Sequence, residues 1–368
     1  MKYIAINATS IFKDQKTGVE WYSLQLVKYL IKEWKGNDPK VVLLAPEKLV
    51  RGKENLLDLP KNWQLTAISG NFLWTQFWLL RYLKKNPPLL LFSPSYVAPF
   101  FLGKIKTVNV IHGLESYYDK NPSYLKNIQD FLLTEPAIKR SSKIVAVSHH
   151  TKEDLVKFLK IAEEIIHVIQ SGPGAFSDEE VHFLAKIKEK DQNNLFISAF
   201  FGGNNPRKNL EKTIKIFLRL IKIMGSKVKF YVSGEIQDRK IENIFKKNNK
   251  NFVYKKYFSE EEKKEYLEKS HFLFYLSSYE GFGFPVLEAQ KSGAIPVILK
   301  QSGLAEVSGQ GVLDFGKEES ESKTAREIVN VSKNQKFRRE LVEAGYENLK
   351  RFSWQKCAEE VRSLLIEE

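Results

Sequence analysis

Short apolar runs alternate with longer amphipathic stretches through most of this chain, and no other feature constrains its fold as strongly. Residues 2–11 have the composition of a strand, and residues 17–34 repeat apolar side chains at helical spacing. Strands that alternate with helices favour a parallel sheet covered by helices. We therefore predict an α/β fold with strands at residues 2–11, 40–45, 63–68, 89–92, 106–111, 143–147 and 165–169, and again at 195–200, 227–233, 252–257, 271–276 and 295–299.

The length of the chain predicts more than one core. Its 368 residues, 43% of them hydrophobic, are enough for two domains of similar size. Glycine and proline gather at residues 170–174, as is typical of a linker. We predict an N-terminal domain over residues 1–172, a C-terminal domain over residues 173–352, and a last helix within residues 353–368 that Ser353 can cap.

Cysteine and histidine usage excludes two classes of site. Cys357 is the single cysteine, which excludes an intramolecular disulfide and a four-cysteine zinc site. The six histidines show no metal-ligand spacing, so we predict no metal. Met1 and Lys2 lead directly into a predicted strand, and no apolar run reaches the length of a membrane span. We expect a protein of the reducing cytoplasm that is soluble or lies on a surface.

Positive charge is concentrated in the first half of the chain. The net charge is +14, and residues 1–172 carry 24 Lys or Arg against 15 Asp or Glu. Such a bias favours an anionic lipid surface or a nucleic acid, although scattered lysines also serve solubility. No RNA-binding aromatic motif, zinc finger or arginine-rich arm accompanies the charge, so we predict no nucleic-acid partner.

Residues 71–85 are the most apolar helix candidate. On a helical projection the apolar side chains cover nearly every face, and Arg81, Lys84 and Lys85 gather toward the C-terminal end. Packing inside the domain is one way to cover the second apolar face. Insertion into the headgroup layer of a membrane is the alternative, because aromatic and lysine side chains suit that layer.

One loop places two carboxylates around a pair of glycines. Glu280 stands just after a predicted buried strand, and Pro285 suits the first turn of the helix that follows. Gly281 and Gly283 leave backbone amides accessible, and Glu288 lies about one helical turn further on. Such a loop can bind hydroxyls and phosphate together. The plainer interpretation is a tight connection with two solvated glutamates.

A second glycine loop precedes the first long helix of the C-terminal domain. Gly202 and Gly203 come before the helix, and Arg207 and Lys208 stand at its start. Bare amides, a helix N-terminus and mobile cations are what a diphosphate requires. A basic helix start without a ligand is the alternative, but cations at that end oppose the helix dipole.

Two residues of the first half are candidates at the carboxyl ends of strands. His112 ends the predicted strand 106–111 and precedes a glycine, which places it at the edge of the sheet where ligands bind. Gly18 closes a polar loop after the first strand and allows close approach to the backbone. A simple turn glycine explains Gly18 equally well.

The motifs together resemble one known family. Residues 280–289 read EGFGFPVLEA and residues 292–297 read SGAIPV, which is similar to the Glu-x7-Glu signature of family-4 retaining glycosyltransferases with the GT-B fold. Further segments agree in order along the chain, so that the resemblance spans nearly all of it: TGVEWY at 17–22, VIHGL at 110–114, VS at 147–148, PRKNL at 206–210 and RFSW at 351–354.

The resemblance implies two Rossmann-like domains, with a nucleotide sugar on the C-terminal one and the acceptor on the N-terminal one. It implies that Glu280 binds hydroxyls of the donor sugar, Glu288 binds the ribose, and Lys208 with Arg207 holds the diphosphate. His112 would lie beside the sugar and Gly18 near the phosphates. The last helix would cross back to the N-terminal domain. Further donor contacts would come from Gly202, Gly203, Gly281, Phe282, Gly283 and Phe284.

The sequence departs from the family pattern at three places. Gly203 replaces a frequent phosphate-binding arginine, Gly113 replaces the aspartate of a His-Asp pair, and residues 171–174 replace an Asn-Gly-Val-Asp segment. The change at Gly203 places more of the leaving-group charge on Arg207 and Lys208. The changes at Gly113 and Gly203 also motivate an alternative, a catalytically impaired nucleotide-sugar-binding or membrane-surface partner on the same scaffold. A sugar phosphorylase or epimerase is a lesser rival.

The reaction that the resemblance implies is retaining hexosyl transfer without a metal or other cofactor. The Pro-Arg-Lys-Asn segment favours mannose from GDP-mannose, with UDP-sugars and dTDP-rhamnose as alternatives. The expected acceptor is a glycan or lipid-linked glycan in surface-polysaccharide synthesis. The expected location is the cytoplasm, with peripheral contact at the inner face of the plasma membrane as a variant.

Overall fold

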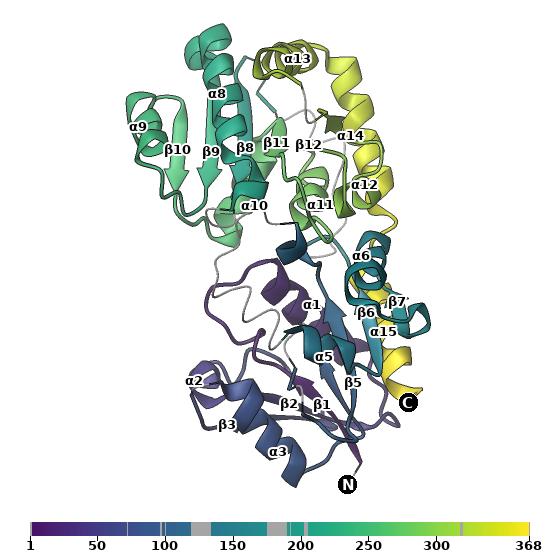
Figure 1. Cartoon of the computed structure of the whole chain (residues 1–368). Coiled ribbons are helices and arrows are strands. Elements are labelled where there is room, and N and C mark those ends of the chain that lie inside the picture. The colour runs from purple at the N-terminus through teal and green to yellow at the C-terminus, as the bar shows by residue number, and fades with distance from the viewer. Residues whose placement is uncertain are drawn as a thin grey trace. The chain divides into compact units, whose positions relative to one another are not determined.

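The computed structural model describes residues 2–71, 73–95, 98–99, 101–118, 134–174, 190–191, 193–201, 205–316 and 319–367. The chain divides into two compact units: Met1–Gly172 with Phe352–Glu368, called the N-terminal unit below, and Pro173–Arg351, called the C-terminal unit. Each unit is built on one parallel sheet (Figure 1). The predicted α/β fold class is therefore confirmed.

The N-terminal unit has a seven-stranded sheet in the order β3-β2-β1-β4-β5-β6-β7. Ile6 of the interior strand β1 pairs in register with Leu43 of β2 and Phe92 of β4, and all three side chains are buried. Apolar residues on successive positions are typical of strands with both faces covered. The strands are β1 (Tyr3–Asn7), β2 (Lys40–Pro46), β3 (Trp63–Ile68), β4 (Leu90–Ser93), β5 (Lys106–Ile111), β6 (Lys143–Ala146) and β7 (Ile166–Val168).

The first strand is shorter than the predicted 2–11. The side-chain oxygen of Asn7 accepts hydrogen bonds from the backbone N–H of Thr9 at 3.2 Å and from its hydroxyl at 2.7 Å. Such a local side-chain bond offers the backbone an alternative to the sheet. The strand therefore ends at Asn7, and a turn begins.

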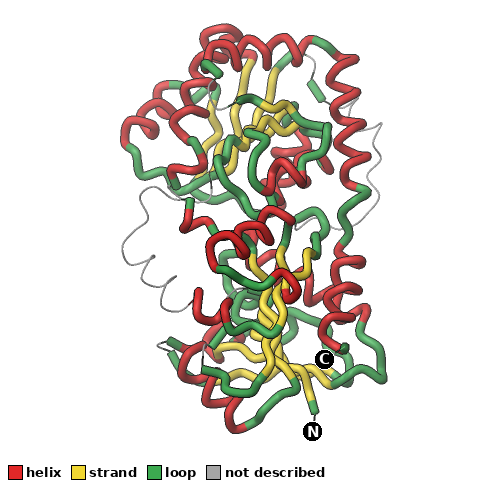
Figure 2. The backbone as a smooth tube through the Cα atoms, turned by 45° about the vertical axis from the view of Figure 1, so that its right-hand side comes forward, coloured by secondary structure: helices red, strands yellow, loops and turns green. Residues whose placement is uncertain are grey.

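Helical segments stand between most consecutive strands of this unit, and Figure 2 shows helices in red around the yellow strands. Ser148 caps α6, because its side chain accepts a hydrogen bond from the N–H of Thr151. The helical sequence pattern at residues 123–140 lies largely outside the described residues. The helical segments are α1 (Gly18–Glu33), α2 (Glu47–Val50), the π-helix η1 (Thr75–Leu79), α3 (Leu80–Lys85), η2 (Glu115–Tyr117), α5 (Glu135–Lys139), α6 (His149–Leu159) and η4 (Glu163–Ile165).

The last helix, α15 (Trp354–Ile366), packs against α1 in the N-terminal unit. Trp354 is buried edge-on against Tyr22 of α1, with 5.5 Å between ring centroids. The guanidinium of Arg362 donates two hydrogen bonds to the carboxylate of Asp38, at 2.6 and 2.7 Å. A buried aromatic pair and a bidentate ion pair fix this helix in the unit.

The C-terminal unit has a six-stranded sheet in the order β10-β9-β8-β11-β12-β13. Phe217 of α8 stacks on Phe230 of β9, with centroids 4.1 Å apart, in the centre of the core. The strands are β8 (Leu195–Phe200), β9 (Val228–Ser233), β10 (Phe252–Lys255), β11 (Phe272–Tyr275), β12 (Ile295–Ile298) and β13 (Leu313–Asp314).

Polar caps determine where several helices of this unit begin. The side chains of Ser320 and Asn334 accept the backbone N–H groups of Lys323 and Phe337, and so they cap the two helices that follow them. The helical segments are η5 (Pro206–Lys208), α8 (Leu210–Met224), η6 (Gly225–Lys227), α9 (Arg239–Lys247), α10 (Glu260–Lys269), α11 (Phe284–Lys291), α12 (Gly303–Val307), α13 (Glu321–Lys333) and α14 (Gln335–Leu349).

Candidate active site

The centre of the candidate site is the loop between β11 and α11, which carries Glu280. Gly283 ends the loop with φ +113° and stands at the N-cap of α11. A Cβ atom at that position would lie 2.5 Å from Cδ2 of Leu304, and the φ value is one that L-residues rarely adopt. The glycine is therefore required by both the backbone conformation and the packing.

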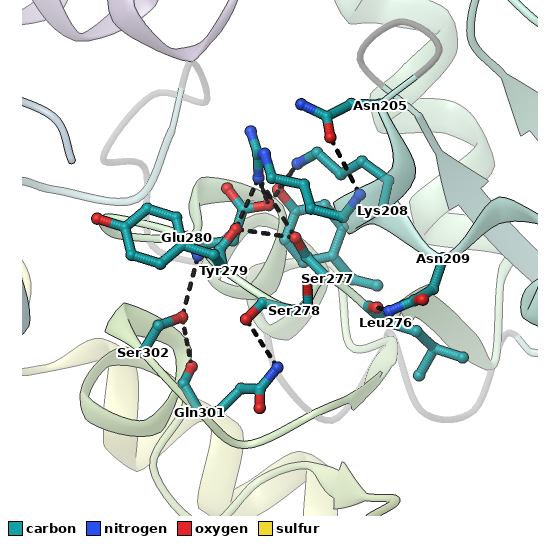
Figure 3. A network of polar contacts seen from close by, with 12 residues as sticks. Asn205, Lys208, Asn209, Leu276, Ser277, Ser278, Tyr279, Glu280, Gln301 and Ser302 are labelled. Atoms are coloured by element: carbon teal, nitrogen blue, oxygen red, sulfur yellow. Dashed lines mark hydrogen bonds and ion pairs between the residues drawn. The ribbon is translucent and has the colours of Figure 1, made fainter. Parts of the chain in front are cut away.

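Two cations meet the Glu280 carboxylate (Figure 3). Nη1 of Arg207 lies 2.7 Å from Oε1 of Glu280, and Nζ of Lys208 forms an ion pair with the same oxygen. Lys208 also donates to the hydroxyl of Tyr275, at 2.8 Å. All three charged side chains are at most 10% exposed, so this cluster is largely removed from water.

The segment with the cations is tied to the Glu280 loop through its backbone. Nη1 of Arg207 donates to the carbonyl of Tyr279 at 2.6 Å, and the carbonyl of Arg207 accepts the N–H of Ser278 at 2.8 Å. Asn209, at φ +50°, donates from Nδ2 to the carbonyl of Leu276 at 2.7 Å. The η5 turn and the loop after β11 thus form one hydrogen-bonded assembly.

A second segment holds the loop from the other side. The N–H of Glu280 donates to Oγ of Ser302 at 3.0 Å, and its carbonyl accepts the N–H of Gly303 at 2.9 Å. A Cβ atom on Gly303 would lie 2.4 Å from the carbonyl oxygen of Gly281. Gly303 is therefore needed because the two backbones approach so closely.

The electrostatics of the cluster favour an anion. Burial alone would raise the pKa of the Glu280 carboxyl, but Lys208 and Arg207 outweigh burial and hold that pKa below its usual range. The carboxylate is then ionised at neutral pH and balances one of the two cations. Together the three side chains carry a net charge of +1, which favours an anion at this largely dehydrated site more than it would in water.

Glu288 has a different environment. Its carboxylate is buried on α11 and lies 2.9 Å from Nζ of Lys263 on α10. Gly174, at φ +55°, lies against the same side chain, because a Cβ atom there would be 2.1 Å from Oε1 of Glu288. Glu288 is thus held between a helix and the first residues of the C-terminal unit.

Two other predicted site residues lie in the N-terminal unit. His112 is half-buried, with Nε2 3.0 Å from the carbonyl of Pro94 and its ring 4.6 Å from that of Tyr22. Gly18 is exposed and is the first residue of α1, where the Thr17–Glu20 capping box begins the helix.

The remaining predicted contacts have mixed outcomes. The rings of Phe282 and Phe284 meet edge to face, with centroids 5.2 Å apart. Gly281 and Gly283 lie in the same loop and are buried. Gly202 and Gly203 lie outside the described residues. In the part of the chain that the structure describes, no three His, Cys, Asp or Glu side chains cluster as metal ligands do.

Comparison with known proteins decides the family. Residues 182–348 match the model of the glycosyl transferases group 1, and residues 16–172 match the model of glycosyltransferase family 4. The chain belongs to the family 4 glycosyltransferases. This confirms the resemblance drawn from the motifs, and it makes the protein a retaining glycosyltransferase.

Relatives of this family 4 glycosyltransferase are distant. The uncharacterized glycosyltransferase MJ1178 of Methanocaldococcus jannaschii is 26% identical over 72% of this chain and 69% of its own length. The serotype-specific mannosyltransferase WbdA of Escherichia coli is 23% identical over 69% of this chain, which spans 32% of that protein. Anabaena Alr3699/HepE, solved with UDP-glucose, is 13% identical, with a TM-score of 0.71 and 100% of each chain covered. The last likeness supports the GT-B fold.

The motifs of this glycosyltransferase did not reveal three contacts of the candidate site. Tyr275, Ser302 and Lys263 all touch one of the two signature glutamates or its cation. Tyr275 stands at the end of a predicted strand, where ligand contacts are common, so its position offered a signal. Ser302 and Lys263 offered none, because Ser302 is 22 residues from Glu280 in the sequence and Lys263 is one of many charged residues on α10.

Proposed function

We propose that this protein transfers a hexose, with retention and without a metal ion, from a nucleotide sugar to a glycan or lipid-linked acceptor in surface-polysaccharide synthesis. The observation that carries the proposal is the Glu280 carboxylate, which is enclosed by Arg207 and Lys208 in the loop of the family signature. The cluster places a carboxylate that can accept hydrogen bonds from hydroxyls directly beside two cationic side chains.

The proposed roles follow from the chemistry of each group. The ionised Glu280 accepts hydrogen bonds from hydroxyls of the donor sugar. Lys208, with Arg207, stabilises the negative charge that develops on the diphosphate as it leaves. Arg207 also donates to the Tyr279 carbonyl, so we assign it mainly to placing the loop, whereas Lys208 supplies a compact point charge suited to a leaving group. Glu288 is proposed to bind the ribose hydroxyls.

Retention is proposed to occur on one face of the sugar. The bond between the anomeric carbon and the phosphate oxygen breaks, and the acceptor oxygen forms its bond on the same face. The proton of the acceptor hydroxyl passes to the departing phosphate oxygen. In this scheme Glu280 orients the donor and is not the nucleophile, which agrees with a carboxylate already engaged by two cations.

The donor is proposed to be GDP-mannose. Support comes from the Pro-Arg-Lys-Asn segment and from the similarity to a mannosyltransferase. UDP-glucose, the ligand named for the Anabaena structure, is the second candidate. Acceptor binding is assigned to the N-terminal unit, with His112 as the residue at the reacting sugar and Gly18 near the phosphates.

A donor screen followed by one substitution tests the proposal. Thermal shifts across GDP-, UDP- and dTDP-sugars would identify the donor, and its slow hydrolysis would report chemistry without an acceptor. Lys208→Met should lower hydrolysis on the order of 100-fold or more, because a charged stabiliser of the leaving group is lost. Lys215→Met, on the exposed side of α8, is the control. A Lys208→Met protein that is folded and fully active would refute the proposed role.

A further inference from the structure

The outer face of helices η1 and α3 in the N-terminal unit is unusually apolar for an exposed surface. Phe77 is 61% exposed and Trp78 is 42% exposed, while Leu79 and Leu83 on the opposite face are fully buried. The indole of Trp78 lies over Gly70, where a Cβ atom would be 2.4 Å from its Cγ. The backbone therefore holds the ring on the surface. Exposed aromatic clusters of this kind mark interaction sites.

The π-helical turn explains why two aromatic side chains point outward. Residues 75–79 form the π-helix η1, and residues 80–85 continue as the α-helix α3. A π-turn adds a residue to the helical repeat and shifts the phase of the side chains that follow. Trp74, Leu79 and Leu83 keep their contacts with the core, and Phe77 and Trp78 are left for another partner. Packing within the unit thus covers one apolar face and not the other.

A cavity of about 520 Å³ adjoins α3 on the same unit. Its lining combines the apolar Leu80, Phe101 and Leu102 with the cations Lys84 and Arg140. Phe101 is 60% exposed, and the guanidinium of Arg140 lies 5.8 Å from the centre of its ring. An apolar wall with two positive charges at its border suits a molecule with a hydrocarbon chain and an anionic head.

Positive charge predominates in the chain segment that forms this surface. No Asp or Glu stands between Asp58 and Glu115 in the sequence. The same stretch carries six cations, Lys61, Arg81, Lys84, Lys85, Lys104 and Lys106. A protein partner with an apolar face would not require this bias, and a second copy of the chain would bring the same charges into repulsion. An anionic bilayer satisfies both the charge and the aromatic side chains.

We propose that Leu73, Phe77, Trp78 and Phe101, together with Arg81, Lys84, Lys85 and Arg140, form a docking surface for an anionic phospholipid bilayer, and that the cavity beside Phe101 takes one lipid. The aromatic rings lie at the headgroup level, and the cations contact lipid phosphates. This inference rests on the surface of the N-terminal unit and does not depend on the proposed transferase reaction.

Vesicle co-sedimentation of the full chain tests the proposal. We expect binding to vesicles of phosphatidylcholine and phosphatidylglycerol in equal parts, little binding to phosphatidylcholine alone, and weaker binding as salt is added. Arg81→Gln with Lys84→Gln should lower the partition coefficient roughly fivefold for each charge removed. Lys246→Gln with Lys247→Gln, two exposed cations of α9, is the matched control and should change the partition much less.

Aromatic insertion is tested separately from charge. Phe77→Ser with Trp78→Ser should lower binding at least tenfold, whereas Tyr257→Ser, a 52% exposed aromatic of the C-terminal unit, should not. Brominated acyl chains should quench the fluorescence of the wild type more than that of Trp78→Phe. The proposal would be overturned if the wild type did not bind vesicles. It would also be overturned if the Phe77→Ser, Trp78→Ser double variant bound vesicles as well as Tyr257→Ser does. So would a shift from dimer to monomer in Phe77→Ser without any change in vesicle binding.

Discussion

The ammonium of Lys263 lies 2.9 Å from Oε2 of Glu288 and 3.5 Å from Oε2 of Glu260, so one lysine of α10 joins a carboxylate of its own first turn to the second glutamate of the family signature. Burial alone would lower the pKa of Lys263, but Glu288 and Glu260 outweigh burial and raise that pKa. Lys263 thus provides a counter-charge for the buried carboxylate of Glu288. We infer that Lys263 positions the proposed ribose-binding carboxylate.

Lys263→Met should destabilise the protein more than an ordinary surface change does. The substitution keeps the length of the side chain but leaves Glu288 buried without its counter-charge, a type of change that costs about 3 kcal/mol or more in the free energy of unfolding. Urea denaturation measures the difference. The neighbouring exposed Lys264→Met is the control and should differ from the wild type by less than about 0.5 kcal/mol. Equal stabilities would show that the pair is not structurally important.

Lys263→Met should also discriminate less between ribonucleotides and 2′-deoxyribonucleotides. If Lys263 orients Glu288 toward the ribose hydroxyls, its loss should weaken binding of the donor's nucleoside diphosphate about tenfold, the value of one hydrogen bond to a charged group. Binding of the 2′-deoxy analogue should change less, since that ligand lacks one of the two hydroxyls. Titration calorimetry with both nucleotides measures the ratio. If both nucleotides lost affinity by the same factor, Lys263 would have a structural role only and would not position Glu288 for the ribose.

Gly303→Ala should distort the Glu280 loop. The added methyl group would lie 2.4 Å from the carbonyl oxygen of Gly281 and 2.6 Å from that of Glu280, so one backbone must move. We expect a loss of about 1–3 kcal/mol in the free energy of unfolding, as for other overpacked sites. In contrast, Gly36→Ala meets no atom within 4 Å and should be neutral or slightly stabilising. Thermal and urea unfolding of both variants provide the test.

Glu280→Gln should remove an acid-sensitive part of the stability. The folded-state pKa of Glu280 is lowered, so its ionised form contributes stability above the unfolded-state pKa of about 4.3, and this contribution disappears as the pH falls through the folded-state pKa. The free energy of unfolding of the wild type should therefore exceed that of Glu280→Gln by a constant amount near neutral pH, and this difference should shrink below about pH 4. Glu211→Gln, whose carboxylate is 79% exposed, should show almost no difference at any pH.

His112 should remain neutral throughout the physiological range. Burial lowers its pKa to about 4, and the hydrogen bond to the Pro94 carbonyl only partly opposes that effect. Because a carbonyl accepts and does not donate, Nε2 carries the proton. Stability linked to this residue should fall as the pH drops from about 6.5 toward the lowered pKa. Imidazole NMR, assigned with His112→Gln, should show titration near pH 4 and no step near 6.5.

Sequence patterns predicted the layout of the fold well because they depend on local periodicity. The strand at 63–68 and the strand at 195–200 have the bounds that were predicted. The ends of strands and helices were predicted less accurately where a side chain hydrogen-bonds to the nearby backbone, as Asn7 does at the end of β1. The π-turn at residues 75–79 was not predicted, since its aromatic residues fit a regular α-helix equally well.

The candidate site was predictable in part. The Glu-x7-Glu spacing and the Arg207-Lys208 pair identified the residues, but the direct contact of both cations with Glu280 was not predicted. The motifs assigned the cations to phosphate and the glutamate to sugar, whereas the described structure brings all three charges together. That contact depends on residues more than 70 positions apart, as the Arg207 and Glu280 separation of 73 shows.

The sequence by itself determined the alternation of strands and helices, the two-domain length, the basic first half and the signature of the family. These properties are set by neighbouring residues and by composition. The tertiary structure decided that Glu280 is held by two cations and Ser302, that Glu288 pairs with Lys263, and that Phe77 and Trp78 remain exposed. Such contacts arise only when distant segments are brought together by the sheet, because burial and the low local dielectric are properties of the packed chain.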